Sequence, residues 1–162
     1  MMTASSSPPE SNAPSAPSPQ PDRPPKLVIA DDEADSLKAL TVYLTAHGFE
    51  VIPTSSGEEA LRKVKEHQPD LAIIDVMMPR LNGFQVARTI KFDKHLKRIP
   101  LILLTARTAA TDRILGERVG ADEYITKPFE PSHLLERIRF WLMKSAKTPH
   151  ASTAGPGTGG GA

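Results

Sequence analysis

The chain has 162 residues, no cysteine, and a formal net charge of +1 at pH 7. The lack of cysteine excludes a disulfide framework and a thiolate metal site, and it is typical of a cytoplasmic protein. A net charge close to zero gives no general attraction to nucleic acid or to acidic membranes. We therefore expect a cytoplasmic protein that makes no direct contact with nucleic acid and does not associate with a membrane.

Both ends of the chain have compositions that do not favour a packed core. Residues 1–25 hold half of the prolines, interleaved with serine and alanine, and residues 145–162 are mainly small residues and proline. Such segments bury too little apolar surface to offset the entropy lost on ordering, so we predict that both are disordered. The first segment also lacks the apolar stretch of a signal peptide or membrane anchor. Residues 26–144 are long enough for one domain with its own core.

Five short apolar runs alternate with helical patterns between the two tails. The runs are Leu27–Ala30, Phe49–Ile52, Leu71–Ile74, Leu101–Leu104 and Tyr124–Thr126. The helical patterns are Ala34–His47, Glu58–His67, Phe84–Phe92, Ala109–Val119 and Ser132–Met143. The third and fourth runs are apolar at nearly every position, as expected for strands covered on both faces. This alternation with short connections predicts an α/β fold with parallel strands joined by right-handed crossovers.

Residues suited to phosphate and metal chemistry follow the ends of these runs. Asp31 and Asp32 follow the first run, and Asp75 follows the third. Thr105 follows the fourth run and Lys127 the fifth. Ligands of parallel α/β sheets bind beyond the carboxyl ends of the strands. Three carboxylates crowded there are unfavourable unless a cation offsets them, and oxygen ligands of this kind suit Mg²⁺. An acidic nucleophile, a metal ion, a lysine and a hydroxyl are what phosphoryl transfer to an aspartate requires.

Each of these residues, taken alone, has a simpler explanation. Asp32 can cap the helix that follows it, Asp75 can form a turn, and Lys127 can be a solvated surface lysine. Their joint placement at one edge of the sheet favours the functional interpretation. The histidines show no metal-ligand spacing. The basic run at residues 91–98 contains an acidic residue and leads into a strand, and we interpret it as a solvated loop.

The segments that carry the strand-end residues resemble a known family. They are Val28–Glu33 (VIADDE), Ile73–Pro79 (IIDVMMP), Leu104–Arg107 (LTAR) and Gly120–Phe129 (GADEYITKPF). In order and spacing they resemble the receiver domain of two-component response regulators, the CheY-like family, and most closely the OmpR/PhoB-type receivers. The resemblance covers essentially all of residues 26–144. It implies a doubly wound, five-stranded parallel sheet of (βα)5 type with the strand order 2-1-3-4-5.

The resemblance also implies which residues accept the phosphoryl group and bind the metal. Asp75 matches the phosphoacceptor of the family. The cofactor would be Mg²⁺, held by Asp31, Asp32, Asp75 and the main-chain carbonyl of Met77. The protein would then not be an enzyme that acts on a separate substrate. It would be a phosphoacceptor with intrinsic Mg²⁺-dependent phosphoryl transfer and autodephosphorylation.

Three further roles and the partners follow from the same resemblance. Lys127 and Thr105 match the residues that contact the phosphoryl oxygens, and Tyr124 matches the aromatic switch residue. The peptide bond between Lys127 and Pro128 matches one that is usually cis in the family. The phosphodonor would be a sensor histidine kinase or a phosphotransfer protein. Phosphorylation would rearrange the face made by the fourth helix, the fifth strand and the fifth helix, where the family binds its output partners.

Other classes of function fit this sequence less well. A haloacid-dehalogenase-type phosphatase needs a second acidic residue two positions after the aspartate, where this chain has Met77. A nucleotide-binding module needs a glycine-rich phosphate loop, and no such motif occurs. A stand-alone receiver is the leading hypothesis, because only a tail follows residue 144. The alternatives are the N-terminal receiver fragment of a DNA-binding response regulator and a pseudo-receiver that binds partners without phosphorylation.

The output face departs from the OmpR/PhoB-type pattern, in which ion pairs around an apolar patch form a symmetric dimer. Glu117 stands where the subfamily has an apolar residue, and His133 stands where it has the acidic partner of Arg113. Helical spacing places Phe140 and Met143 away from the core-facing side of the last helix. We therefore expect the phosphorylated face to bind a different protein rather than a second copy of the chain.

Overall fold

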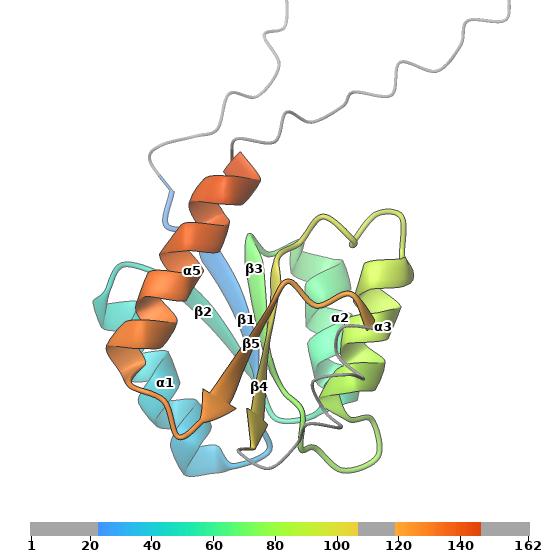
Figure 1. Ribbon diagram of the computed structural model, residues 1–162, viewed down its shortest axis with the longest axis horizontal. Coiled ribbons are helices and arrows are strands. Elements are labelled where there is room, and N and C mark those ends of the chain that lie inside the picture. Colours follow the sequence, from blue (N-terminus) through green and yellow to red (C-terminus); the bar gives the residue numbers. More distant parts are fainter. Residues whose placement is uncertain (1–22, 107–118, 147–162) are drawn as a thin grey trace, which may run out of the picture.

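The structure of the protein is a computed structural model, and it describes residues 23–106 and 119–146. Figure 1 shows a central sheet between two layers of helices. The strands are β1 (Lys26–Ala30), β2 (Glu50–Thr54), β3 (Leu71–Asp75), β4 (Leu101–Ala106) and β5 (Glu123–Lys127). Neighbouring strands are parallel, and their order is β2-β1-β3-β4-β5. The prediction of a doubly wound α/β sheet with this strand order is confirmed.

Helices cover both faces of the sheet. They are α1 (Ala34–Ala46), α2 (Gly57–His67), α3 (Gly83–Phe92) and α5 (Pro131–Ala146). Helices α1 and α5 lie on one face, and α2 and α3 lie on the other (Figure 1). The helix expected at 109–119 falls outside the described residues, apart from Val119, which is helical. In the described part of the chain, no helix is long and apolar enough to span a membrane.

The alternation of side chains along the strands divides the core into two layers. Leu27, Ile29 and Ile73 are fully buried in the layer beneath α1 and α5. Val28 and Ala72, on the same strands, belong to the layer beneath α2 and α3. Strand β3 is buried at every position because both of its faces are covered. This is why its sequence is a continuous apolar run rather than an alternation of apolar and polar residues.

Helix α3 begins at a reciprocal side-chain cap. The side-chain oxygen of Asn82 accepts from the backbone N–H of Gln85 at 3.0 Å, and the side-chain oxygen of Gln85 accepts from the backbone N–H of Asn82 at 2.9 Å. This capping box satisfies two N–H groups that a helix start leaves without partners. The helix therefore starts at Gly83, one residue before the expected Phe84.

The described structure extends beyond the expected domain at both ends. Arg23 lies in the segment that was expected to be disordered, but its guanidinium pairs with Asp70 at 3.2 Å. Helix α5 continues to Ala146, two residues past the expected domain end at residue 144. Local composition does not reveal the pairing of Arg23, because Asp70 is distant in sequence. The rest of both predicted tails lies outside the described residues.

Candidate functional site

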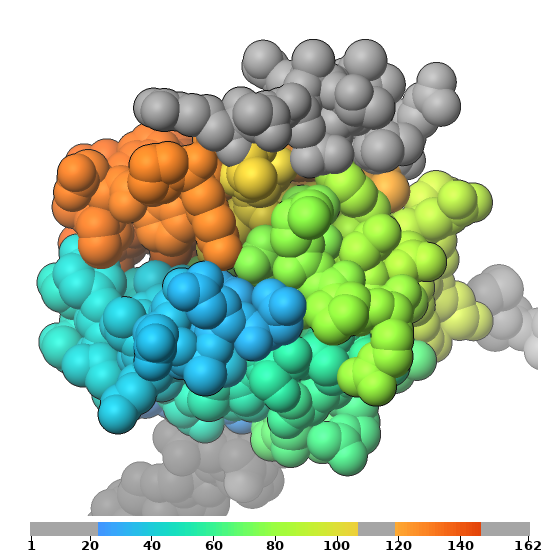
Figure 2. Space-filling view, turned by 90° about the horizontal axis from the view of Figure 1, so that it is seen from below, coloured from blue at the N-terminus to red at the C-terminus, as the bar shows by residue number. Residues whose placement is uncertain are grey.

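Three carboxylates meet at the carboxyl edge of the sheet. Asp75 is the last residue of β3, and Asp31 and Asp32 directly follow β1. One carboxylate oxygen from each lies within 4.8 Å of the others. Seen from this edge, the segments after β1 and β3 lie next to each other, in blue and green (Figure 2). Asp31 and Asp75 are 4% and 5% exposed, whereas Asp32 is exposed. The structure thus brings together the three aspartates that the sequence singles out.

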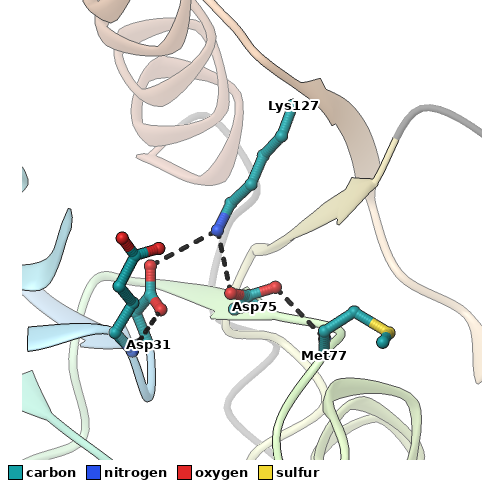
Figure 3. Close-up of polar contacts among 5 residues, drawn as sticks. Asp31, Asp75, Met77 and Lys127 are labelled. Atoms are coloured by element: carbon teal, nitrogen blue, oxygen red, sulfur yellow. Dashed lines mark hydrogen bonds and ion pairs between the residues drawn. The ribbon is translucent and has the colours of Figure 1, made fainter.

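Lys127, the last residue of β5, places its ammonium group in this cluster. Its Nζ lies 2.8 Å from Oδ2 of Asp75 and 3.4 Å from Oδ2 of Asp31 (Figure 3). The peptide bond between Lys127 and Pro128 is cis, as the resemblance implies. One ammonium therefore contacts two of the three carboxylates, and the cluster is negative when all four groups are ionised.

Backbone N–H groups hold the two buried carboxylates in place. The N–H of Met77 donates to Oδ1 of Asp75 at 3.1 Å, and the N–H of Glu33 donates to Oδ1 of Asp31 at 2.9 Å. The side chain of Met77 is 65% exposed, so this residue joins the site through its backbone (Figure 3). In each buried aspartate, Oδ1 thus accepts a hydrogen bond from a backbone N–H. The other carboxylate oxygen, Oδ2, lies next to the ammonium of Lys127.

Burial and charge shift the pKa of both groups in the central ion pair. Burial raises the pKa of Asp75, and the charge of Asp31 raises it further, although Lys127 and the N–H of Met77 act in the opposite direction. Burial also works to lower the pKa of Lys127, but the hydrogen bonds and charges of Asp75 and Asp31 outweigh it, and that pKa is raised. The ionised form of Asp75 is therefore incompletely compensated, and additional positive charge would stabilise it.

The donor set at this edge fits a hard divalent cation. Carboxylate oxygens of Asp31, Asp32 and Asp75 converge there, and the exposure of Asp32 leaves the cluster open to water. Mg²⁺ prefers oxygen ligands and keeps several of its waters. The raised pKa of Asp75 is a separate sign that the cluster has a deficit of positive charge. The residues present therefore fit Mg²⁺.

Thr105 and Tyr124 lie on the two strands next to the cluster. In the β3–β4 register Asp75 is opposite Leu104, so Thr105 stands one position beyond the aspartate. Its side chain is 7% exposed. Tyr124 lies near the start of β5 in the layer beneath α3, with its ring centroid 6.5 Å from that of Phe84. The structure places the threonine at the cluster and the tyrosine deeper along the sheet.

Gly83, the first residue of α3, supports the site but was not singled out from the sequence. A Cβ on this residue would lie 2.4 Å from the carbonyl oxygen of Asp75 and 2.7 Å from Cα of Val76. Its N–H donates to the carbonyl of Val76 at 3.0 Å. Only glycine lets the start of α3 rest directly on the end of β3. The signal that could have found it is the capping-box pair Asn82 and Gln85, which marks this helix start.

Comparison with known proteins identifies the family. The family model described as the response regulator receiver domain matches residues 27–139, which is more than half of the chain. The chain belongs to this family.

Relatives and solved structures agree with a receiver domain. The "Probable transcriptional regulator ycf27" of Guillardia theta is 42% identical over 133 residues, which are 80% of this chain and 51% of that protein. The "DNA-binding response regulator MtrA" of Mycobacterium tuberculosis is 37% identical over 124 residues, which are 76% of this chain and 53% of that protein. The signal receiver domain of a histidine kinase from Syntrophus aciditrophicus superimposes with a TM-score of 0.73 and is 30% identical, covering 81% of this chain and 99% of that one. The receiver chain spans about half the length of the curated relatives it matches.

The receiver domain also carries exposed apolar side chains on α5. Phe140 is 44% exposed and Met143 is 62% exposed, as predicted from helical spacing. Next to them, Glu123 of β5 accepts hydrogen bonds from Nε of Arg137, at 2.7 Å, and from the indole N–H of Trp141. The departures that the sequence shows on the fourth helix lie outside the described residues. Whether this face binds a different protein therefore stays a prediction.

Proposed function

We propose that this receiver domain is a cytoplasmic phosphoacceptor of a two-component phosphorelay and that Asp75 is its acceptor. The observation that carries the proposal is the position of Asp75, which is buried at the end of β3 with Nζ of Lys127 2.8 Å from one carboxylate oxygen. A carboxylate in this position is a nucleophile next to positive charge that can offset an incoming phosphoryl group. The chain is thus an acceptor rather than an enzyme with a separate substrate.

Asp31, Asp32, Asp75 and the main-chain carbonyl of Met77 would hold Mg²⁺. When bound, the cation supplies positive charge to the oxygens of the transferring phosphoryl group. Asp31 is buried and fixed by the N–H of Glu33, so it contributes a rigid ligand. Asp32 is exposed and is free to adjust its position as water and the cation are exchanged.

Transfer to Asp75 needs position and charge more than covalent machinery. A phosphohistidine on a sensor kinase or phosphotransfer protein presents its phosphoryl group in line with a carboxylate oxygen of Asp75. The bond from phosphorus to the imidazole nitrogen breaks as the bond to the aspartate oxygen forms. Lys127 then directs its ammonium to the phosphoryl oxygens, and Thr105 donates its hydroxyl to one of them.

The switch follows from the added charge. An acyl phosphate brings about two negative charges to the carboxyl edge. Movement of Thr105 towards them vacates space into which Tyr124 turns. Glu123 precedes this tyrosine in β5 and is tied to α5 by the 2.7 Å ion pair with Arg137, so a shift of β5 reaches the output face. The phosphoryl group thereby changes the population of two conformations of that face.

Two outputs fit this switch. In the first, the chain is a stand-alone receiver whose output face binds a protein partner, and the exposed Phe140 and Met143 support it. In the second, it is the receiver part of a DNA-binding response regulator. The second is favoured by the curated relatives, of which this chain matches only about half and which include one described as DNA-binding. An antibody against residues 26–144 distinguishes them: endogenous protein of 162 residues supports the first, and a product about one and a half times that length, as in the relatives, supports the second.

Chemical phosphorylation tests the assignment of Asp75. The full chain is incubated with acetyl phosphate and Mg²⁺, and intact-protein mass spectrometry detects one added phosphoryl group. We expect modification of the wild type, none of Asp75→Ala, and wild-type modification of Asp35→Ala, an exposed carboxylate on α1. Modification of Asp75→Ala at the wild-type rate contradicts the assignment. A folded wild type that is never modified supports the pseudo-receiver alternative instead.

A further inference from the structure

The end of α3 and its connection to β4 form the most basic segment of the described chain. Between residues 88 and 98 there are five lysines and arginines and one aspartate. The segment leads into the first residue of β4, so it lies at the amino edge of the sheet. This edge is opposite the aspartate cluster, as the connection between α3 and β4 in Figure 1 shows. The proposed phosphorylation chemistry does not use it.

The side chains of two charged residues in this segment bind to groups within the protein. The ammonium of Lys91 donates to the carbonyls of Lys97, at 3.1 Å, and Ile99, at 2.8 Å, and it also pairs with Asp122. The carboxylate of Asp93 accepts from the backbone N–H of His95, at 2.7 Å, and from that of the next residue. The sequence suggested a solvated loop because Asp93 interrupts the basic run. In the structure, the carboxylate of Asp93 instead stabilises a turn of the backbone.

Three other cations of this segment are exposed, together with an aromatic ring. Arg88, Lys94 and Lys97 are exposed, and Phe92 is 72% exposed. The guanidinium carbon of Arg88 lies 5.6 Å from the centroid of the Phe92 ring. We call these four residues the α3–β4 patch. It presents three cations and a solvated aromatic ring whose geometry is partly fixed by the arginine.

We propose that the α3–β4 patch binds single-stranded nucleic acid. Bases stack on the ring of Phe92, and Arg88, Lys94 and Lys97 neutralise backbone phosphates. An exposed aromatic ring on a basic segment is the combination that single strands use, because every base offers a π-face and every nucleotide a phosphate. A duplex would use the cations but leave the ring without a partner, since its bases are already stacked.

Other polyanions fit the patch less well. An anionic bilayer attracts lysine and arginine, but stable attachment needs a larger apolar surface or a lipid chain, and the patch offers one ring. An acidic polypeptide pairs with the cations, but its carboxylates make no use of the aromatic face. Both are therefore outcomes of the test rather than part of the proposal.

The chain contains a matched control for the aromatic residue. Phe140 on α5 is also exposed, and the guanidinium of Arg137 lies 4.4 Å from its ring centroid. That arginine is paired with Glu123 on β5, and α5 covers the other face of the sheet. Phe140→Ala thus removes an exposed ring stacked on an arginine without touching the α3–β4 patch.

The test is fluorescence anisotropy of a 5′-labelled 15-nucleotide oligo-dT titrated with the full chain at several salt concentrations. Phe92→Ala is expected to weaken binding by about 5- to 150-fold, the range for loss of one stacked base. Phe140→Ala is expected to leave binding unchanged. If the three cations each contact a phosphate, the slope of log K against log salt is about −2 for single strands. Lys94→Ala with Lys97→Ala is expected to reduce its magnitude by about 1.4, and Lys38→Ala on α1 is expected not to change it.

Three results would overturn the proposal. One is absence of binding in low salt, and another is equal weakening by Phe92→Ala and Phe140→Ala. The third is binding of poly-glutamate or of phosphatidylserine vesicles that is as tight as binding of the oligonucleotide and as sensitive to Phe92→Ala. Circular dichroism confirms that each variant is folded. Because the patch and the aspartate cluster lie at opposite edges, Asp75→Ala is expected to bind the oligonucleotide normally. Failure of this proposal is thus separable from failure of the phosphoacceptor assignment.

Discussion

The two edges of the sheet differ in how well their partly buried charges are balanced. At the amino edge, Lys91 pairs with Asp122 and donates to two backbone carbonyls, while Asp122 also accepts from the backbone N–H of Leu101 at 2.8 Å. One cation there is matched by one anion, and backbone groups use the remaining hydrogen-bonding capacity. At the carboxyl edge, three carboxylates converge, the ammonium of Lys127 contacts two of them, and the pKa of Asp75 is raised mainly by burial.

The difference teaches how to separate a structural ion pair from a binding site. At the amino edge, one cation is balanced by one anion and both are held by backbone groups, so removing one partner harms the fold. At the carboxyl edge, the excess of negative charge is unfavourable, and a bound cation would stabilise the cluster. The two lysines, Lys91 and Lys127, therefore provide a direct comparison within one chain.

The largest expected effect is the loss of stability on removing the amino-edge lysine. Lys91→Ala leaves Asp122 and two carbonyls without their common donor, and we expect a loss of about 3 kcal/mol. Lys127→Ala is expected to cost only about 1 kcal/mol without Mg²⁺, because the raised pKa of Asp75 lets a proton replace part of the lost charge. Urea unfolding measures both. Equal losses for the two variants would contradict the comparison.

The second prediction concerns relief of the unbalanced cluster by metal. Mg²⁺ at a hundred times its dissociation constant is expected to stabilise the wild type by about 2.7 kcal/mol, because it binds only the folded state. Asp32→Ala is expected to lose most of this gain, since hard-cation affinity depends on charged oxygen ligands. Thermal unfolding with increasing Mg²⁺ provides the measurement, and Asp35→Ala on α1 is the control. Full stabilisation of Asp32→Ala would show that other groups hold the cation.

The third prediction concerns how the stability of the protein depends on pH through the carboxyl group of Asp75. A raised pKa means that the folded state holds the proton of Asp75 more tightly than the unfolded state does. The resulting stabilisation is complete below the ordinary pKa of 3.8 and is lost as pH rises through the raised value. Without metal, we therefore expect Asp75→Asn to be more stable than the wild type at pH 7, by up to about 1 kcal/mol.

Melting temperatures of both proteins between pH 3 and pH 8 provide the check for Asp75→Asn. The difference is expected to be near zero at the acidic end and to grow as pH increases. A difference that does not vary with pH would indicate a packing effect of the substitution rather than relief of charge.

The smallest expected effect is that of removing both tails. Because the amino-edge network closes within the described residues, a chain of residues 23–146 is expected to lose about 0.5 kcal/mol or less, or about 2–4 °C in melting temperature. Removing Arg23 as well should add little, because its pair with Asp70 is 56% exposed on the arginine side. A drop of 10 °C or more on removing the tails would show that one of them packs on the domain.

Much of the fold and of the site arrangement could be predicted from the sequence. Strands β3 and β4 can be predicted because they are continuous apolar runs. A strand in a parallel sheet that is covered on both faces is buried at every position. Asp75 could be placed near Lys127 for a geometric reason, since the carboxyl ends of parallel strands share one edge. The strand order and the assignment of roles came from the resemblance to a family, which carries more information than periodicity does.

Other features depend on contacts between residues that are far apart in sequence. The ion pair between Lys91 and Asp122 could not be predicted, because Asp122 lies two elements later in the chain. The contact of Gly83 with the carbonyl of Asp75 needs the three-dimensional path of two backbones. The sequence shows the residues in each case, but only the fold shows which groups they face.

The hydrogen bond between Trp141 and Glu123 gives the protein a built-in optical probe. Trp141 is the only tryptophan in the chain, and the carboxylate that holds its indole N–H directly precedes Tyr124 in β5. Indole emission depends on the charge and hydrogen bonding around the ring. A displacement of β5 therefore changes the colour or intensity of the protein's own fluorescence. Rates of activation and recovery can thus be recorded on unlabelled chain, in real time and at concentrations too low for calorimetry.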